Sequence, residues 1–212
     1  MSDVKRITHH INGAYWTGSA ERSGDVYNPA TGKVTGKVDF ASVAVVDHAI
    51  EIATRAQAEW RNASLAKRVQ VLFAFREILN ARKEEVARLI TAEHGKVLSD
   101  ALGEVTRGLE VIEFACGIPH LLKGEFTDSA GPGIDMYSMR QALGVTAGIT
   151  PFNFPAMIPM WMFAPAIACG NAFILKPSER DPSVPLMLAE LMEEAGLPKG
   201  ILQVVNGDKE AV

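Results

Sequence analysis

The clearest hydrophobic periodicity of the chain lies between residues 98 and 116. Apolar residues recur there at alternating spacings of four and three, at Leu98, Leu102, Val105, Leu109, Ile112 and Cys116. This spacing places a single apolar stripe along one side of an α-helix. Three further helices are predicted before it. Two begin at Ser42 and near Ser64, because serine is a favoured N-cap, and the third ends at Gly95, a typical residue just after a helix C-terminus.

Turn signals interrupt the pattern near the N-terminus and again after the helical region. Asn12-Gly13 is the pair that a two-residue hairpin favours, because both positions take positive φ. Residues 28–32 (NPATG) form a second turn. Gly131-Pro132-Gly133 separates two extended stretches within residues 123–141. The sequence therefore predicts short strands near the N-terminus and a later hairpin that projects from the helical layer.

The last seventy residues alternate short apolar runs with helical periods. The predicted elements are strands at 144–150, 172–175 and 201–205 and helices at 155–169 and 183–194. Short strands separated by helices form a parallel sheet with right-handed crossovers. The fold class is therefore α/β.

This pattern divides the chain into three parts. Residues 1–122 are expected to form strands and helices that pack on a nucleotide-binding domain. Residues 123–141 form the hairpin, and residues 142–212 form the first half of a Rossmann-like parallel sheet. Such a sheet binds its ligand beyond the carboxyl ends of its strands.

Composition and charge narrow the function without naming it. The 212 residues are 48% hydrophobic and carry a net charge of −4, unlike a protein with a basic face for nucleic acid. The longest apolar stretch, residues 154–169, is broken by prolines and is shorter than the roughly 20 residues of a membrane span. Two cysteines give no disulfide framework, so a cytoplasmic location is expected. Cys116 and His120 alone do not make a zinc site, so no metal is expected.

Asn153 lies in the segment that directly follows the first predicted parallel strand, between two aromatic residues and two prolines. Its side-chain amide is able to donate a hydrogen bond to a developing oxyanion, and one such donor contributes roughly 3–4 kcal/mol to acyl-transfer catalysis. The alternative is an Asx turn that caps the next helix. The residues alone leave both interpretations open.

Lys176 and Glu179 follow the second parallel strand. An ammonium and a carboxylate placed together suit the vicinal hydroxyls of a ribose, and the carboxylate repels a 2′-phosphate, which favours NAD over NADP. The alternative is a solvated ion pair in a loop. No glycine-rich G-x-G-x-x-G follows the first strand, so an ordinary Rossmann dehydrogenase is not expected.

Several linked motifs together resemble the aldehyde dehydrogenase superfamily. They are NPATG (28–32), GITPFNFP (148–155), LKPSE (175–179), AGLP (195–198) and VVNG (204–207), in this order. Residues 103–115 (GEVTRGLEVIEFA) and 161–163 (WMF) are similar to the methylmalonate-semialdehyde dehydrogenase branch. The resemblance covers nearly the whole chain. It implies NAD-dependent, CoA-acylating oxidation of methylmalonate or malonate semialdehyde to propionyl-CoA or acetyl-CoA, with loss of carbon dioxide.

The resemblance also implies roles for particular residues. Asn153 would be the oxyanion donor, and the hairpin at 123–141 would pair subunits into dimers and tetramers. The residues implied to contact NAD are Thr150, Pro151, Phe152, Lys176, Glu179 and Arg180.

The family's nucleophilic cysteine is expected much further along a chain roughly twice as long. Cys116 and Cys169 are interpreted as small buried hydrophobic residues. The 212 residues alone are therefore expected to lack dehydrogenase activity. An alternative is a non-catalytic remnant of the family that acts as an assembly module.

Arg107 is a candidate for binding the substrate carboxylate, since a planar guanidinium binds a carboxylate in a bidentate manner. It lies about 200° around the helix from Val105, on the face shared with Gly103, Glu110 and Phe114. Gly103 and Gly108 are expected to leave room for a close neighbour. The alternative is a solvent-facing arginine paired with Glu104, Glu110 or Glu113. The resemblance favours the substrate pocket.

Overall fold

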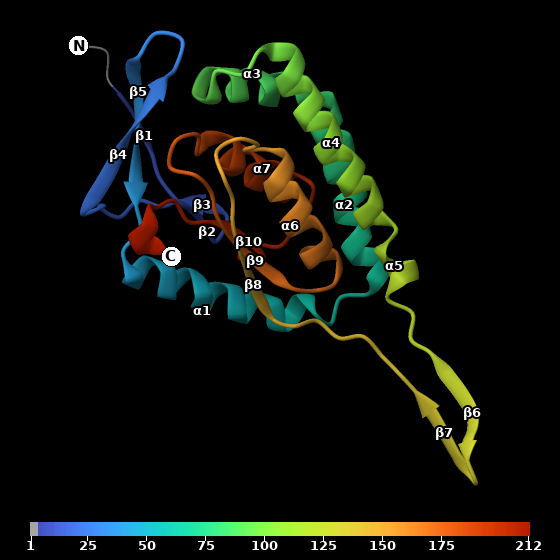
Figure 1. Ribbon diagram of the computed structural model, residues 1–212. Coiled ribbons are helices and arrows are strands. Elements are labelled where there is room, and N and C mark those ends of the chain that lie inside the picture. Colours follow the sequence, from blue (N-terminus) through green and yellow to red (C-terminus); the bar gives the residue numbers. More distant parts are fainter. Residues whose placement is uncertain (1–3) are drawn as a thin grey trace.

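The computed structural model describes residues 4–212, and its centre is a five-stranded sheet with the order β3-β2-β10-β9-β8 (Figure 1). Three of its strands are the predicted parallel ones, β8 (Val145–Ile149), β9 (Ala172–Lys176) and β10 (Leu202–Val204). The α/β fold and the parallel half-sheet are therefore confirmed.

Two N-terminal strands extend this sheet. Their addition to the sheet was not predicted from the sequence. β2 (His10–Ile11) pairs antiparallel with β10, and β3 (Ala14–Tyr15) pairs with β2 across the predicted hairpin. Asn12 and Gly13 have φ values of 53° and 74°, as such a turn requires. β2 and β3 thus belong to the same sheet as the C-terminal strands.

Buried hydrogen bonds hold this N-terminal addition in place. The backbone N–H of Asn206 donates to Nδ1 of His9 at 3.0 Å, and its side chain donates to the carbonyl oxygen of Thr8 at 2.7 Å. Burial lowers the pKa of His9 to about 4. At neutral pH the uncharged imidazole is therefore able to accept the Asn206 hydrogen bond.

A second, smaller sheet lies beside the first, with the order β1-β5-β4. Its strands are β1 (Lys5–Ile7), β4 (Arg22–Asn28) and β5 (Lys33–Phe40). The predicted turn at residues 28–32 joins β4 to β5. Oδ1 of Asn28 accepts the Ala30 N–H at 2.9 Å, and Gly32 has a φ of 66°. The turn therefore depends on an Asx hydrogen bond and on a left-handed glycine.

Helices cover both faces of the large sheet (Figure 1). α1 (Val43–Trp60) packs on one face, and α6 (Met157–Ala168) and α7 (Ser183–Glu194) pack on the other. Three helices then pack over α6 and α7, and a short helix follows them. These are α2 (Leu65–Ala81), α3 (Lys83–His94), α4 (Leu98–Cys116) and α5 (Ile118–Leu121). Within residues 4–212, no helix combines the length and apolar character that a bilayer crossing requires.

The predicted helix signals are confirmed in most details. Ser64 caps α2 by accepting the Lys67 N–H, and Gly95 ends α3 with a φ of 83°. Ser42 is the N-cap of α1, but its side chain makes no capping hydrogen bond.

The apolar stripe of α4 faces the core as predicted, although its first turn is less buried than its centre. Val105, Leu109 and Ile112 are at most 6% exposed, whereas Leu98 and Leu102 are only partly buried.

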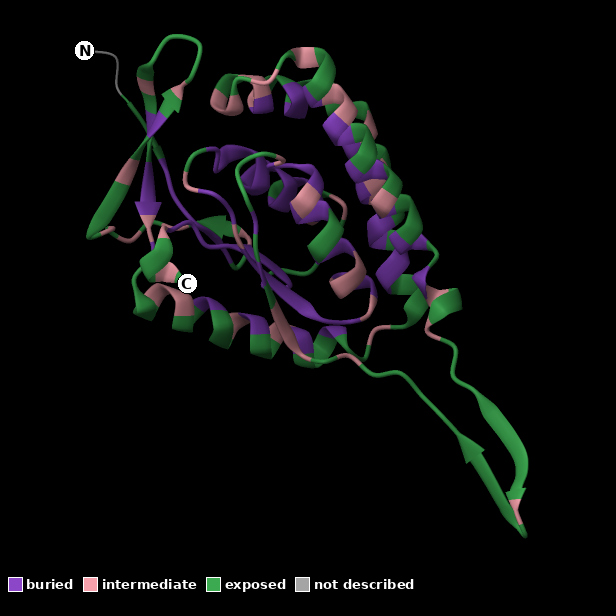
Figure 2. Cartoon of the chain, viewed as in Figure 1, coloured by how far each residue is buried: buried purple, intermediate pink, exposed green. Residues whose placement is uncertain are grey.

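The hairpin consists of β6 (Phe126–Gly131) and β7 (Ile134–Tyr137) and projects away from the body of the protein (Figure 2). Its apolar side chains are open to solvent, with Phe126, Met136 and Tyr137 each at least 60% exposed. A two-stranded hairpin has only marginal stability by itself in water. The role of the hairpin in subunit pairing remains a proposal.

Candidate functional site

Two loops meet at the carboxyl edge of the parallel sheet. The first, residues 150–156, joins β8 to α6, and the second, residues 177–182, joins β9 to α7. The Thr150 N–H donates to the carbonyl oxygen of Lys176 at 3.1 Å, which fastens the starts of the two loops to each other. The residues predicted to bind NAD therefore lie on adjacent segments.

The Asn153 side chain is free. It is exposed, and among residues 4–212 it makes no side-chain hydrogen bond. The start of α6 is instead capped by a carboxylate from another helix, because Oε1 of Glu104 accepts the N–H groups of Ala156 and Met157 at 2.8 and 3.2 Å. The Asx cap that remained an alternative for Asn153 is thus not formed, and its amide is available to a ligand.

Lys176 and Glu179 lie together, as the ribose hypothesis requires. Nζ of Lys176 lies 3.6 Å from Oε2 of Glu179, and their side chains are 14% and 41% exposed. The hydroxyl of Thr150, at the start of the first loop, is buried and has no hydrogen-bond partner in the described chain. An ammonium, a carboxylate and an unused hydroxyl at one sheet edge fit the sugar of a nicotinamide dinucleotide.

Phe152 lies between two polar groups. The Arg180 guanidinium carbon lies 5.0 Å from the centre of the Phe152 ring, and the His94 ring stacks on it with centroids 6.3 Å apart. These contacts link the two loops to the C-terminal end of α3. A cavity of about 510 Å³ lies between this cluster and β4.

Asp181 borders this cavity as a buried carboxyl group. It is 2% exposed, and neither of its oxygens makes a hydrogen bond of ordinary geometry within residues 4–212, although the Ser178 hydroxyl lies close to it. Burial raises the pKa of Asp181 to about 7, and the carboxylates of Glu93 and Glu104 add to this effect. The Ser178 hydroxyl and the Lys96 ammonium oppose it. The group therefore titrates near neutral pH.

We expect Asp181→Asn to stabilise the protein progressively, relative to wild type, as the pH rises from about 4 to 7. The carboxyl has a pKa of 3.8 when unfolded and about 7 when folded. Between these values the unfolded carboxyl ionises while the folded one stays protonated, so the wild type, unlike the Asn variant, loses stability as the pH rises. The difference corresponds to at most roughly 4 kcal/mol. Chemical denaturation of both proteins at pH 5 and pH 8 measures it. A difference in unfolding free energy that is the same at both pH values contradicts the assignment.

Arg107 lies on the exposed side of α4 and makes no ion pair within residues 4–212. The alternative pairing is not formed: Glu104 pairs with Lys96, and Glu113 pairs with Arg76. Glu104 precedes Arg107 by nearly one turn and reaches the start of α6. Residues three apart are neighbours on a helix surface, so Arg107 lies next to Glu104 on α4.

The two glycines near Arg107 have different surroundings. A Cβ atom on Gly108 would overlap the side chain of Met160, so this glycine allows α4 and α6 to pack closely. A Cβ atom on Gly103 would meet no atom within 4 Å. The prediction that both glycines make room for a neighbour is therefore correct only for Gly108.

Neither cysteine resembles an activated nucleophile. Cys116 is buried and Cys169 is partly buried, and burial raises the pKa of both thiols above the usual range. A raised pKa lowers the thiolate fraction at neutral pH. The two residues act as small apolar side chains, although Cys169 is less buried than predicted.

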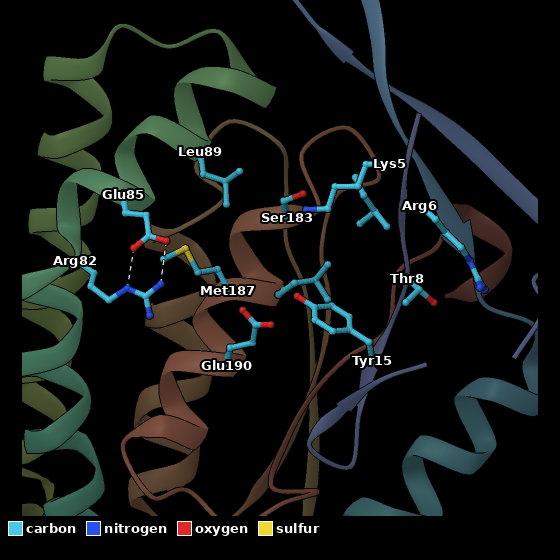
Figure 3. Close-up of a pocket in the computed structure, with 12 residues that line it drawn as sticks. Lys5, Arg6, Thr8, Tyr15, Arg82, Glu85, Leu89, Ser183, Met187 and Glu190 are labelled. Carbon is cyan, nitrogen blue, oxygen red and sulfur yellow. Dashed lines mark hydrogen bonds and ion pairs between the residues drawn. The ribbon is translucent and has the colours of Figure 1, made fainter. Parts of the chain in front are cut away.

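A separate cavity of about 440 Å³ lies between the N-terminal strands and α7 (Figure 3). Several of its charged groups form ion pairs with other residues of the protein. The Arg82 guanidinium donates to both carboxylate oxygens of Glu85 at 2.7 and 2.9 Å. Burial, together with the Glu190 carboxylate, raises the pKa of Tyr15.

Sequence reasoning missed Lys96 and treated Glu104 only as a partner for Arg107. The available signal was the pair of small residues beside Glu104: Ala101 precedes it by three positions and Gly108 follows it by four. Such small residues mark a helix face that packs closely, so a carboxylate between them is expected to be buried.

Known protein families and solved structures agree with the resemblance seen in the sequence motifs. The aldehyde dehydrogenase family model matches residues 16–212. The chain is 53% identical over 204 residues to a malonate-semialdehyde dehydrogenase of Pseudomonas aeruginosa, covering 96% of this chain and 41% of that protein.

Solved structures have the same fold. A Sinorhizobium meliloti protein assigned to the methylmalonate-semialdehyde dehydrogenases, crystallised with NAD, is 58% identical with a TM-score of 0.97. The match covers 100% of this chain and 43% of that one. The methylmalonate-semialdehyde dehydrogenase of Oceanimonas doudoroffii is 54% identical with a TM-score of 0.95, and the match covers 98% and 42%. The chain thus spans less than half the length of these relatives. It belongs to the aldehyde dehydrogenase family.

Proposed function

We propose that the protein containing this chain oxidises malonate or methylmalonate semialdehyde with NAD and transfers the acyl group to CoA, with loss of carbon dioxide. The observation that carries the proposal is the free amide of Asn153 at the carboxyl edge of the sheet, in a chain more than half identical to proteins named for these substrates. A cytoplasmic location, which suits two unpaired cysteines, is part of the proposal.

Each part of the site has one task in this reaction. NAD, when bound, supplies the hydride acceptor. Lys176 and Glu179 hold its ribose, while Thr150, Pro151, Phe152 and Arg180 line the same edge. Asn153 donates a hydrogen bond to the aldehyde oxygen as that oxygen gains charge. Arg107 holds the substrate carboxylate and so selects a semialdehyde of a dicarboxylic acid.

The division of the chain supports this arrangement. We propose that residues 1–122 buttress the nucleotide-binding part, residues 142–212, and that residues 123–141 pair subunits into a homo-oligomer. The exposed apolar side chains of β6 and β7 support the pairing role, because solvent-exposed Phe126, Met136 and Tyr137 are suited to an interface. The nucleophilic cysteine is assigned to a part of the protein outside these 212 residues, so these residues alone are expected to be inactive.

The direct test is an assay of the protein that contains this chain with malonate semialdehyde, NAD and CoA. We expect NADH and acetyl-CoA to appear in equal amounts, and acetyl-CoA formation to require both cofactors. Mass spectrometry identifies the acyl product. NADH formation that yields only free malonate, whether or not CoA is present, excludes the CoA-acylating reaction.

We expect Glu179→Gln to raise the KM for NAD about tenfold and to narrow the preference for NAD over NADP. The amide accepts ribose hydrogen bonds less strongly than a carboxylate does, and it no longer repels a 2′-phosphate. It also leaves the Lys176 ammonium, 3.6 Å away in the wild type, without a counter-charge. Initial rates with each cofactor measure the change.

Glu51→Gln, on the exposed side of α1, is a matched control that leaves both constants unchanged. Equal use of NAD and NADP by the unmodified protein contradicts the role given to Glu179.

A further inference from the structure

A buried ion pair lies directly behind the Asn153 turn. Lys96 comes from the link between α3 and α4, and Glu104 comes from the second turn of α4. Nζ of Lys96 lies 2.6 Å from Oε2 of Glu104, and their side chains are 12% and 1% exposed. The cost of removing two charges from water largely cancels their attraction. Net stability alone therefore does not account for the pair.

Both members of the pair hold the backbone of the turn. Nζ of Lys96 donates to the carbonyl oxygen of Asn153 at 2.9 Å and lies 4.3 Å from the centre of the Phe154 ring. The second oxygen of Glu104 accepts the two N–H groups at the start of α6, at 2.8 and 3.2 Å. One ion pair thus fixes the turn at Asn153 itself and at the beginning of the helix that follows.

The side chain of Asn153, by contrast, is held by nothing among residues 4–212. It is exposed and makes no hydrogen bond of its own. The backbone therefore fixes only where this side chain begins, and with it the region that the amide can reach. A displacement of about 1 Å in a catalytic group can cost about 10²-fold in rate, so the fixed backbone has a direct consequence for the reaction.

We propose that Lys96 and Glu104 are positioning residues, which hold the Asn153 backbone so that its amide points at the aldehyde oxygen. Glu104 performs the helix capping that Asn153 would otherwise perform, and Lys96 anchors the Asn153 carbonyl. This inference rests on the oxyanion role proposed above for Asn153.

The test is a double-mutant cycle in the complete enzyme. We expect Lys96→Met to lower kcat by about 10- to 100-fold, with the KM values for aldehyde and NAD within about threefold of wild type. In an Asn153→Ala background the same change is expected to lower kcat by less than about twofold, because the group being positioned is already absent. Lys96→Arg keeps the charge and should recover part of the loss.

Two further variants provide a substitute for Lys96→Met and a control. Glu104→Gln keeps the shape and one carbonyl acceptor for the helix N–H groups, and we expect its effect on kcat to depend on Asn153 in the same way. It takes the place of Lys96→Met if that variant does not fold. Lys83→Met is the control, since Lys83 is exposed at the start of α3 and makes no ion pair within residues 4–212. It should leave kcat unchanged.

The outcomes separate the two proposals. If Asn153→Ala lowers kcat but Lys96→Met and Glu104→Gln lower it equally with and without Asn153, the positioning role is overturned and the oxyanion role stands. An unchanged kcat in Lys96→Met also overturns the positioning role. If Asn153→Ala leaves kcat unchanged, the oxyanion role itself fails and the positioning role fails with it.

Discussion

We expect Asn153→Ala to lower kcat of the complete enzyme by about 10²–10³ and to leave the affinity for NAD within about threefold. The amide is exposed, is not used as a helix cap and lies at the carboxyl edge of the sheet, so its removal takes away a hydrogen-bond donor and disturbs little else. Glu104 continues to cap α6 in the variant, because that interaction involves only backbone groups of the helix. Steady-state kinetics and NAD titration measure the two effects separately.

Asn153→Asp is a second test of the hydrogen-bond donor role. A carboxylate has nearly the same shape as the amide but offers no donor, and it repels an oxygen that gains negative charge. We therefore expect kcat to fall at least as far as in the alanine variant. Asn62→Ala, which removes an exposed amide at the end of α1, is the control. A loss confined to the KM for the aldehyde would show that Asn153 binds substrate or shapes the turn without stabilising the oxyanion.

The local elements of the fold were predictable because their signals are local. The helix from Leu98 to Cys116 follows from one apolar stripe, and the turn at Asn12-Gly13 follows from two residues that accept positive φ. The parallel direction of β8, β9 and β10 follows from the alternation of strands and helices. Each inference needed only residues that are close together in the sequence.

The long-range pairings were not predictable in this way. The addition of β2 to β10 joins His10 to Val204, and nothing in the two-residue strand β2 indicates its partner. The buried hydrogen bond from Asn206 to His9 was likewise not predictable, since a histidine pair near the N-terminus has many possible surroundings. Such contacts are set by how the whole chain packs.

The same distinction separates the predicted and the missed parts of the site. The edge position of Asn153, Lys176 and Glu179 follows from the rule that loops at the carboxyl ends of parallel strands lie together. The support beneath them does not, because Glu104 caps α6 at Ala156, 52 residues later in the sequence. The sequence thus predicted which groups lie at the carboxyl edge of the sheet, whereas the structure was needed to see what holds their loops in place.

Arg107 is the group on which substrate selection is proposed to depend, and its surroundings support this. It is exposed on α4. Of its alternative acidic partners, Glu113 pairs with Arg76 and Glu104 pairs with Lys96. Gly108 next to it lets α4 approach α6, the helix that begins directly after the Asn153 turn. An arginine on α4 that has no ion-pair partner within residues 4–212 is suited to receive the free carboxylate of a semialdehyde.

We expect Arg107→Leu to lower kcat/KM for malonate semialdehyde by about 10²-fold, or ~3 kcal/mol, and to leave kcat/KM for propanal within about threefold. Malonate semialdehyde carries a carboxylate that loses its bidentate partner, whereas propanal has no charge to bind. Arg107→Lys keeps the charge but not the planar pair of donors, so it should fall between the two. Arg88→Leu, which removes an exposed arginine that pairs with Glu84 on α3, is the control for loss of a surface charge. Equal losses of kcat/KM on both substrates would show that Arg107 supports the fold and does not bind the carboxylate.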